Sequence, residues 1–200
     1  SKELTADVMR GEKPFESFAF AADMPKWNTE NPAVQDYLIG TAAEWTRKYG
    51  VDAWRLDVPD EVSFRFLEHF KKRIRETNPE AYIIGEIWQK STAWLRAGVF
   101  DGAMDYPLYF AIRDFAMKRT DGVETFAERI KDVFLSAPDC VRPRQLAFCG
   151  NHDIPRPLTV CGHGSSSRRA AATVLARACD NLWLYASVLV LSVCPVMVSR

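Results

Sequence analysis

The sequence predicts an α/β fold that forms part of a (β/α)₈ barrel, and three observations support this. Apolar strand patterns and amphipathic helix patterns alternate along the 200 residues with short connections, which is typical of parallel βα units. About four such units fit in this length, roughly half of a barrel of ~250 residues. Carboxylates follow three of the strands at their carboxyl ends, where barrel active sites form. An open doubly wound sheet is the alternative, but no glycine-rich phosphate loop follows any strand.

The ends of the first predicted helix are marked by residues with known capping roles. Asn31-Pro32 supplies a capping side chain followed by proline at the first helical position, and Gly50 can end the helix. Val51–Val58 is then expected to form a strand. The later elements are expected in this order: a helix containing Phe64, Leu67, Phe70 and Ile74, a strand Tyr82–Ile87, a weaker helix Ser91–Ala97, a short strand Gly102–Met104, helices Leu108–Lys118 and Val123–Leu135, and a strand Gln145–Cys149.

The composition is that of a globular chain with no electrostatic preference for a charged partner. Hydrophobic residues make up 48%, and 26 Lys and Arg balance 26 Asp and Glu. A net charge of zero gives no argument for nucleic acid or an anionic membrane, so neither is expected, whereas an uncharged polymer remains open. The 5 cysteines show no zinc or redox spacing, and the first ten residues lack a signal-peptide pattern. Free thiols in a cytoplasmic protein are therefore expected.

Two of the carboxylates have contrasting surroundings in the sequence. Strand alternation points Arg55 and Asp57 to the same side, and a neighbouring arginine keeps a carboxylate ionised, as a nucleophile requires. Glu86 instead follows an apolar run, and apolar surroundings raise the pKa of a carboxyl group, as a general acid requires. Cleavage of a glycosidic bond needs such a pair.

Each of these signals also has a purely structural interpretation. An Arg-x-Asp string is commonly an ion pair, a Glu after an apolar run is commonly a strand end that faces water, and Asn151-His152-Asp153 is commonly a turn held by its own side chains. However, the three carboxylates are all expected at the same end of successive units. This conjunction favours a catalytic site that contains Asp57, Glu86 and Asp153.

Several strings resemble a known family. Three of them resemble conserved regions of the α-amylase family: Ala53-Trp54-Arg55-Leu56-Asp57-Val58, Gly85-Glu86-Ile87-Trp88 and Gly150-Asn151-His152-Asp153-Ile154-Pro155-Arg156. Two more, Met24–Thr29 and Phe100–Pro107, resemble its cyclomaltodextrinase, neopullulanase and maltogenic amylase branch. The resemblance covers roughly residues 12–160.

The resemblance implies a retaining hydrolase of α-1,4-glucosidic bonds in cyclodextrins, pullulan or maltooligosaccharides. It makes Asp57 the nucleophile, Glu86 the general acid/base and Asp153 the residue that grips the sugar hydroxyls at the cleaved unit. It also implies that Arg55 orients Asp57 and that His152 contacts the same sugar. Further candidates for substrate binding are Trp88, Asp60 and Glu61.

Alternatives remain for these last candidates and for the activity. Core packing is an equal alternative for Trp88, and capping of the next helix is one for Asp60 and Glu61. The activity could instead be that of an α-glucosidase or a general α-amylase, or the chain could be a non-catalytic glucan-binding remnant.

The partners and cofactors follow from the same resemblance. The expected partner is an α-glucan oligosaccharide or a cyclodextrin, with no nucleic acid and no membrane, and a homodimeric parent is compatible with the branch. No organic cofactor and no metal ligand are expected. Some relatives bind structural calcium, but no oxygen-ligand cluster in the sequence places one here.

The sequence departs from the family at both ends. The family's first conserved region, on the third barrel strand, is not found, so residues 1–160 are expected to hold about strands 4 to 7. Residues 161–200 form an atypical segment with an apolar run, Leu182–Val198. This run could be a barrel helix and strand, a membrane span, or the result of a frame error or truncation, which is the favoured interpretation. Such a fragment is expected to be inactive alone.

Overall fold

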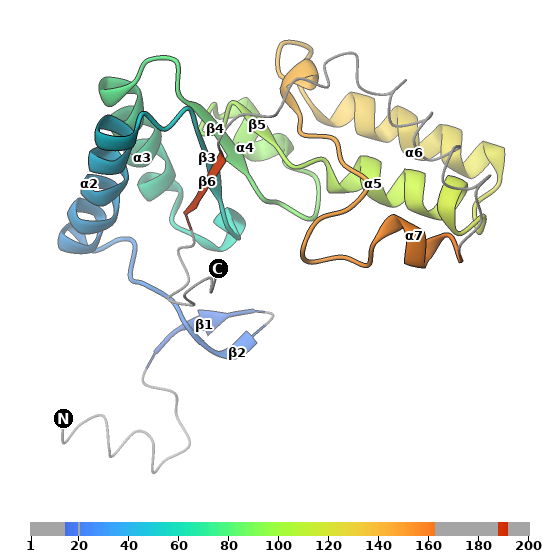
Figure 1. The fold of residues 1–200 in the computed structure, drawn as a ribbon, viewed down its shortest axis with the longest axis horizontal. Coiled ribbons are helices and arrows are strands. Elements are labelled where there is room, and N and C mark those ends of the chain that lie inside the picture. The colour runs from blue at the N-terminus through green and yellow to red at the C-terminus, as the bar shows by residue number, and fades with distance from the viewer. Residues whose placement is uncertain (1–14, 20, 163–187, 192–200) are drawn as a thin grey trace.

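The computed structural model describes residues 15–19, 21–162 and 188–191 (Figure 1). Its strands are β1 (Ser17–Phe18), β2 (Ala21–Pro25), β3 (Ala53–Leu56), β4 (Tyr82–Gly85), β5 (Gly102–Ala103) and β6 (Val188–Leu191). Strands β1 and β2 form a small antiparallel hairpin. The other four form one parallel sheet in the order β5-β4-β3-β6, so the predicted parallel α/β architecture is confirmed for the described residues.

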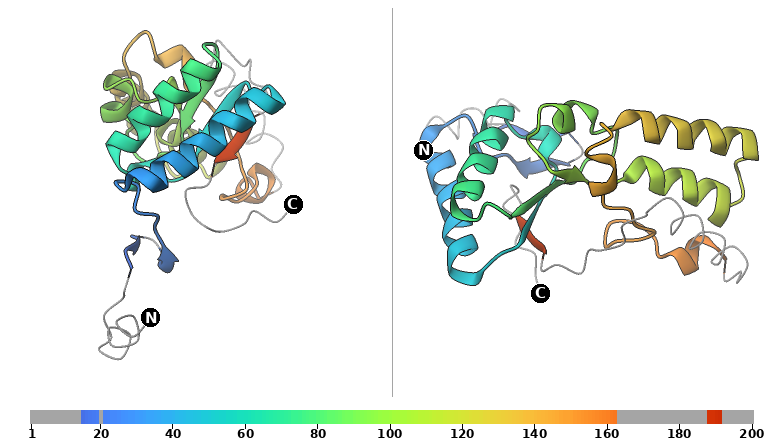
Figure 2. Two further views of the ribbon diagram at one scale, coloured as in Figure 1. Left: turned by 90° about the vertical axis from the view of Figure 1, so that its left-hand side faces the viewer. Right: turned by 90° about the horizontal axis from the view of Figure 1, so that it is seen from above.

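Helices follow β3, β4 and β5 along the chain, and one long helix precedes β3. They are α2 (Pro32–Tyr49), α3 (Phe64–Thr77), α4 (Thr92–Arg96), α5 (Tyr106–Ile112), α6 (Val123–Ser136) and α7 (Pro157–Val160), with the short turns η1 (Pro59–Glu61), η2 (Arg113–Met117) and η3 (Arg142–Arg144). Helices α2 and α3 lie side by side on one face of the sheet (Figures 1 and 2). Helices α5 and α6 pack on each other beyond the β5 edge.

The predicted caps account for the ends of the first long helix. The side chain of Asn31 accepts a hydrogen bond from the amide of Ala33 at 2.9 Å. Gly50 adopts the left-handed conformation, with φ 62°, and its amide donates to the carbonyl of Thr46. Helix α3 begins in a similar way, because Ser63 Oγ accepts from the amide of Phe66 at 3.3 Å.

Side chains of β3 and β4 alternate between the two faces of the sheet. Trp54 and Ile83 enter the core beneath α2 and α3, where the Trp54 indole donates to Thr46 Oγ1 at 2.9 Å. Ile84 belongs to a different cluster that includes Tyr106 of α5. The face turned away from α2 and α3 therefore carries aromatic residues near the carboxyl ends of the strands.

A close contact at the end of β4 leads to a test of the fold. A Cβ atom added at Gly85 would lie 2.6 Å from Cε2 of Phe100, a fully buried ring. Gly85→Ala is therefore expected to destabilise the protein by about 1–3 kcal/mol, measured by chemical denaturation. Gly40→Ala on exposed α2 is the control, because nothing lies within 4 Å of the added atom. It should be neutral or stabilise by up to about 1 kcal/mol. Equal stability of the two variants would contradict the packing at Gly85.

The expected strand Gln145–Cys149 is wrong. Only Leu146 pairs, in an isolated parallel bridge to Met104. Its amide donates to the carbonyl of Ala103, and its carbonyl accepts from the amide of Asp105, each at 2.9 Å. Strand β5 is two residues long and the chain then enters α5, so a longer ladder has no partner on this side.

The expected helix Leu108–Lys118 is correct in kind but differs at both ends. It begins two residues earlier, at Tyr106, because Asp105 caps it by accepting from the amide of Leu108 at 3.1 Å. It ends in the π-helical turn η2, in which the amide of Lys118 donates to the carbonyl of Arg113 at 2.8 Å.

Strand β6 runs parallel to β3 on the edge opposite β4. The remainder of the apolar run Leu182–Val198 lies outside the described residues, as do Cys179, Cys194 and most of the expected segment 161–200. Among the helices that are described, none is long and apolar enough to cross a membrane.

Candidate active site

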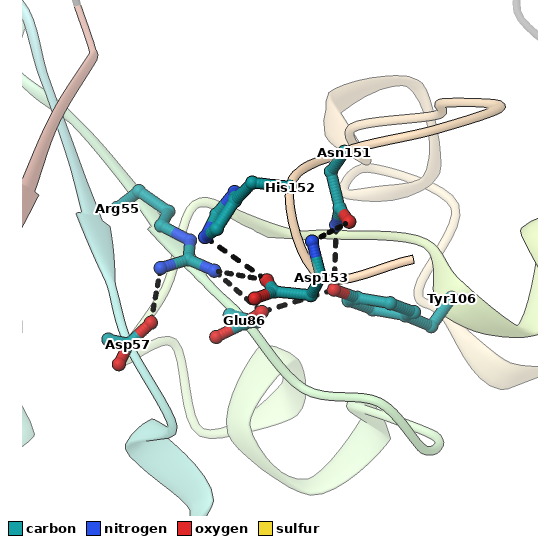
Figure 3. Close-up of polar contacts among 7 residues, drawn as sticks. All are labelled: Arg55, Asp57, Glu86, Tyr106, Asn151, His152 and Asp153. Carbon is teal, nitrogen blue, oxygen red and sulfur yellow. Dashed lines mark hydrogen bonds and ion pairs between the residues drawn. The ribbon is translucent and has the colours of Figure 1, made fainter. Parts of the chain in front are cut away.

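The first two predicted residues meet at the carboxyl end of β3. Arg55 is buried within the strand, and Asp57 is the first residue beyond it. Arg55 Nη1 donates to Asp57 Oδ1, which confirms that both side chains point to the same side (Figure 3). The next residue, Val58, has a φ of 44° and turns the chain into η1.

Glu86 lies at the equivalent position of the neighbouring strand. It directly follows β4, and its amide donates to the carbonyl of Leu56 at 3.0 Å, which fixes it beside β3. Its side chain is buried, and Oε1 lies 2.6 Å from Arg55 Nη2. Arg55 therefore contacts both carboxylates, whereas the sequence predicted an arginine contact for Asp57 alone.

The surroundings of Glu86 favour its protonated form. Burial is the largest cause and raises the pKa of Glu86 from 4.5 to about 7. The charge of Arg55 acts in the opposite direction, and a hydrogen bond and the charge of Asp57 raise the pKa further. The hydroxyl of Tyr106, which donates to Oε1, lowers it. The predicted upward shift of the pKa is therefore present, despite the arginine contact.

The third carboxylate comes from the loop before α7. Asp153 Oδ2 lies 3.8 Å from Arg55 Nη2 and 3.2 Å from His152 Nε2. The amide of Asp153 donates to Asn151 Oδ1 at 2.9 Å, so the loop is also the side-chain-held turn that the structural interpretation predicted. The turn and the convergence occur together: Asp57, Glu86 and Asp153 surround one guanidinium (Figure 3).

Trp88 lies beside this cluster and is 43% exposed. One side of its indole stacks on Tyr106, with ring centroids 4.4 Å apart and planes inclined by 16°. Core packing therefore accounts for only part of this side chain. The exposed part is available to a ligand.

Asp60 and Glu61 lie in η1, and neither caps the next helix, because Ser63 does. Burial raises the pKa of Asp60. The carboxylate of Glu61 lies 2.7 Å from Lys26 Nζ and accepts two hydrogen bonds from the amide of Ala19. These contacts lower the pKa of Glu61 against the opposing effect of its burial. The capping alternative is thus wrong, and Glu61 connects η1 to the β1-β2 hairpin.

Two residues at the site were not predicted from the sequence. The Tyr106 hydroxyl donates to Glu86 Oε1 at 3.1 Å and accepts from Asn151 Nδ2 at 2.8 Å. Asn151 was noted only as part of its turn and of a family string, and Tyr106 only as part of a family string. A usable signal was the position of Tyr106 shortly after the end of β5, because other polar site residues follow the ends of strands in this sheet.

The fold and the site together define a parallel α/β protein with clustered carboxylates at the carboxyl ends of neighbouring strands. The model of the alpha-amylase catalytic domain matches residues 11–186. The chain therefore belongs to the alpha-amylase catalytic domain family, as the resemblance predicted.

Individual relatives agree with this membership. A maltogenic alpha-amylase of Bacillus acidopullulyticus is 39% identical over 155 residues, covering 78% of this chain and 26% of the relative. A cyclomaltodextrinase of Geobacillus thermopakistaniensis is 40% identical over 148 residues, covering 74% and 25%. A solved cyclomaltodextrinase structure has a TM-score of 0.72 at 34% identity, covering 81% of this chain and 27% of that one. The chain thus spans about a quarter of the length of these relatives.

Proposed function

We propose that the complete protein hydrolyses α-1,4-glucosidic bonds, in cyclodextrins, pullulan or maltooligosaccharides, with retention of the α-configuration. One observation carries the proposal: Asp57, Glu86 and Asp153 converge on the guanidinium of Arg55, the first two from the ends of neighbouring strands and the third from the loop before α7. The family membership and the names of the relatives support the substrate class.

In this proposal the two strand-end carboxylates have different tasks. Asp57 attacks the anomeric carbon while Glu86 gives its proton to the leaving oxygen, and a glucosyl ester forms on Asp57. Glu86 then removes a proton from a water molecule as the water oxygen attacks the anomeric carbon. The bond between this carbon and Asp57 breaks, which releases the sugar and restores both the Asp57 carboxylate and the protonated Glu86. The raised pKa of Glu86 suits the first step, because a buried carboxyl group with a pKa of about 7 still holds its proton near neutral pH.

The spacing of the carboxylates supports retention rather than inversion. Asp57 and Glu86 contact the two terminal nitrogens of the same guanidinium. A hydrogen bond with Asp57 is also among the causes that raise the pKa of Glu86. This proximity favours the ~5 Å separation of retaining enzymes over the ~6.5–9.5 Å of inverting enzymes.

The remaining predicted residues receive binding roles. Asp153 and His152 grip the hydroxyls of the cleaved sugar, and Arg55 orients Asp57. Trp88 offers its exposed part to a sugar ring, which agrees with the use of aromatic faces in binding uncharged ligands. Asp60 and Glu61 remain candidates for the acceptor side.

We further propose that β3, β4, β5 and the segment around Leu146 represent strands 4 to 7 of a (β/α)₈ barrel and that the chain alone is inactive. Hydrolysis needs no organic cofactor in this scheme, since both reacting groups are side chains. Cytoplasmic localisation is supported by the free thiols of Cys140, Cys149 and Cys161.

The test is the anomeric form of the first product. The complete protein is incubated with a cyclodextrin, pullulan or a maltooligosaccharide, and the earliest reducing sugar is observed by proton NMR. Initial release of the α-anomer is expected. Initial release of the β-anomer would exclude the double-displacement scheme, and binding without any cleavage would favour the glucan-binding alternative.

A further inference from the structure

A buried tyrosine connects the proposed proton donor to the loop that carries the third carboxylate. Tyr106 has no solvent exposure, and its hydroxyl lies between two polar groups, Glu86 Oε1 at 3.1 Å and Asn151 Nδ2 at 2.8 Å. The ring is held by stacking against Trp88 and by edge contact with Phe148, with centroids 4.9 Å apart. These ring contacts therefore hold the hydroxyl oxygen in place.

The direction of these hydrogen bonds follows from chemistry. The amide nitrogen of Asn151 can only donate, so the hydroxyl oxygen of Tyr106 must accept from it. The single hydroxyl hydrogen is then available for Glu86 Oε1, which accepts it. Burial raises the pKa of Tyr106 above its ordinary value, so the hydroxyl keeps this hydrogen.

The ion pair between Arg55 and Glu86 involves the same oxygen of the carboxyl group. Arg55 Nη2 lies 2.6 Å from Oε1, the atom that the tyrosine also contacts. The other charged groups of the cluster are Asp57, whose charge acts on Glu86, and Asp153, which His152 contacts. The tyrosine hydrogen and the charge of Arg55 both act on Glu86 at Oε1 and disfavour a further proton there, so the proton is favoured on Oε2.

We propose that Tyr106, held by Asn151, is a positioning residue that confines the transferable proton of Glu86 to Oε2. This inference rests on the proposed function, because it concerns the proton that Glu86 gives to the leaving oxygen. A defined oxygen presents the proton in one direction, which is the geometric requirement of general acid catalysis. Tyr106 acts through Glu86 and does not touch the reacting atoms.

Tyr106→Phe in the complete protein tests this directly, because it removes the hydroxyl and keeps the ring. The hydrogen bond from Tyr106 favours the ionised carboxylate of Glu86. Its removal should therefore raise the pKa of Glu86 and move the alkaline limb of kcat/KM to higher pH by about one pH unit. At the optimum, kcat on a maltooligosaccharide should fall about tenfold, with KM changed less than about twofold. An aryl α-maltoside with an acidic phenol needs little protonation, so its kcat should fall much less.

Tyr109→Phe is the matched control. Tyr109 is equally buried on the same helix, and its hydroxyl interacts with Arg113. This variant should leave the alkaline limb in place. A limb that moved equally in both variants would contradict a specific role for Tyr106.

Asn151→Asp tests the orientation of the Tyr106 hydroxyl by changing its hydrogen-bond partner in the loop. It keeps the oxygen that accepts from the amide of Asp153, but it replaces the donor to Tyr106 with an acceptor. The tyrosine hydrogen should then turn away from Glu86, and the alkaline limb should again move upward. When Asn151→Asp is combined with Tyr106→Phe, it should move the alkaline limb less than it does alone, because only the charge of the new aspartate can then act on Glu86. This variant decides the question if Tyr106→Phe does not fold.

The outcomes separate this inference from the proposed function. If the unsubstituted protein cleaves α-glucan but the alkaline limb of kcat/KM stays in place in both Tyr106→Phe and Asn151→Asp, the inference about Tyr106 is overturned and the proposed function stands. An unsubstituted protein that cleaves no α-glucan would overturn both.

Discussion

Asp57→Asn in the complete protein should reduce kcat on a maltooligosaccharide by a factor on the order of 10⁴ to 10⁶, while substrate binding and folding persist. The amide cannot attack the anomeric carbon, yet it has the same size and can still accept a hydrogen bond from Arg55. Steady-state kinetics measure the loss of kcat. Thermal unfolding and binding of a maltooligosaccharide show that the site is otherwise intact.

Asp52→Asn is the matched control for this substitution. Asp52 is exposed at the opposite end of the same strand region, so the same chemical change there should leave kcat unaltered. Full activity of Asp57→Asn would show that the nucleophile has been assigned to the wrong residue. Equal losses in both variants would point to a general effect on the strand.

Glu86→Gln should lower kcat on a maltooligosaccharide by about 10²- to 10⁴-fold, because the amide cannot protonate the leaving oxygen. An aryl α-maltoside with an acidic phenol should lose much less in its first step, since that leaving group departs without a proton. The unsubstituted protein should show an alkaline limb near pH 7, because the acid must be protonated and its pKa is about 7. Similar losses on both substrates would argue against Glu86 as the acid.

The same residue predicts a pH dependence of stability. The pKa of Glu86 is raised on folding from 4.5 to about 7, so between these values the folded state binds more protons than the unfolded state. The contribution of Glu86 to the free energy of unfolding is complete below pH 4.5 and is lost as the pH rises through 7. The free energy of unfolding, measured by denaturation at pH 5 and at pH 8, should therefore decline less between these pH values in Glu86→Gln than in the unsubstituted protein. An equal decline would contradict the raised pKa.

Local sequence signals predicted much of the fold because they reflect local physics. Asn31, Gly50 and the alternation in β3 define a helix and a strand through contacts within a few residues. The shared direction of Arg55 and Asp57 follows from the same alternation, so their ion pair was predictable.

Features that depend on distant partners were not predictable in the same way. On α2 the capping signals correctly indicated a helix, but the large apolar residues Trp45 and Tyr49 are exposed, while Gln35 and Thr46 are buried. Hydrogen bonds from Gln35 to the carbonyl of Thr29 and from Trp54 to Thr46 make this burial favourable. These partners cannot be read from helical periodicity.

The site shows the same difference between local contacts, which were predictable, and contacts to distant residues, which were not. The arginine contact to Glu86 joins two strands, and the tyrosine contact joins a strand end to α5, so neither is visible in a local string. The predicted strand before Asn151 failed for a related reason, since a strand requires a neighbouring ladder as well as a suitable sequence.

The most direct measurement is mass spectrometry of the protein after reaction with a fluorinated maltosyl donor, whose covalent ester hydrolyses slowly. Nucleophilic attack by the carboxylate beyond β3 predicts one added fluorinated maltosyl group on the peptide that contains Asp57. An adduct on a different carboxylate, or turnover of the donor with no adduct on any peptide, would contradict it.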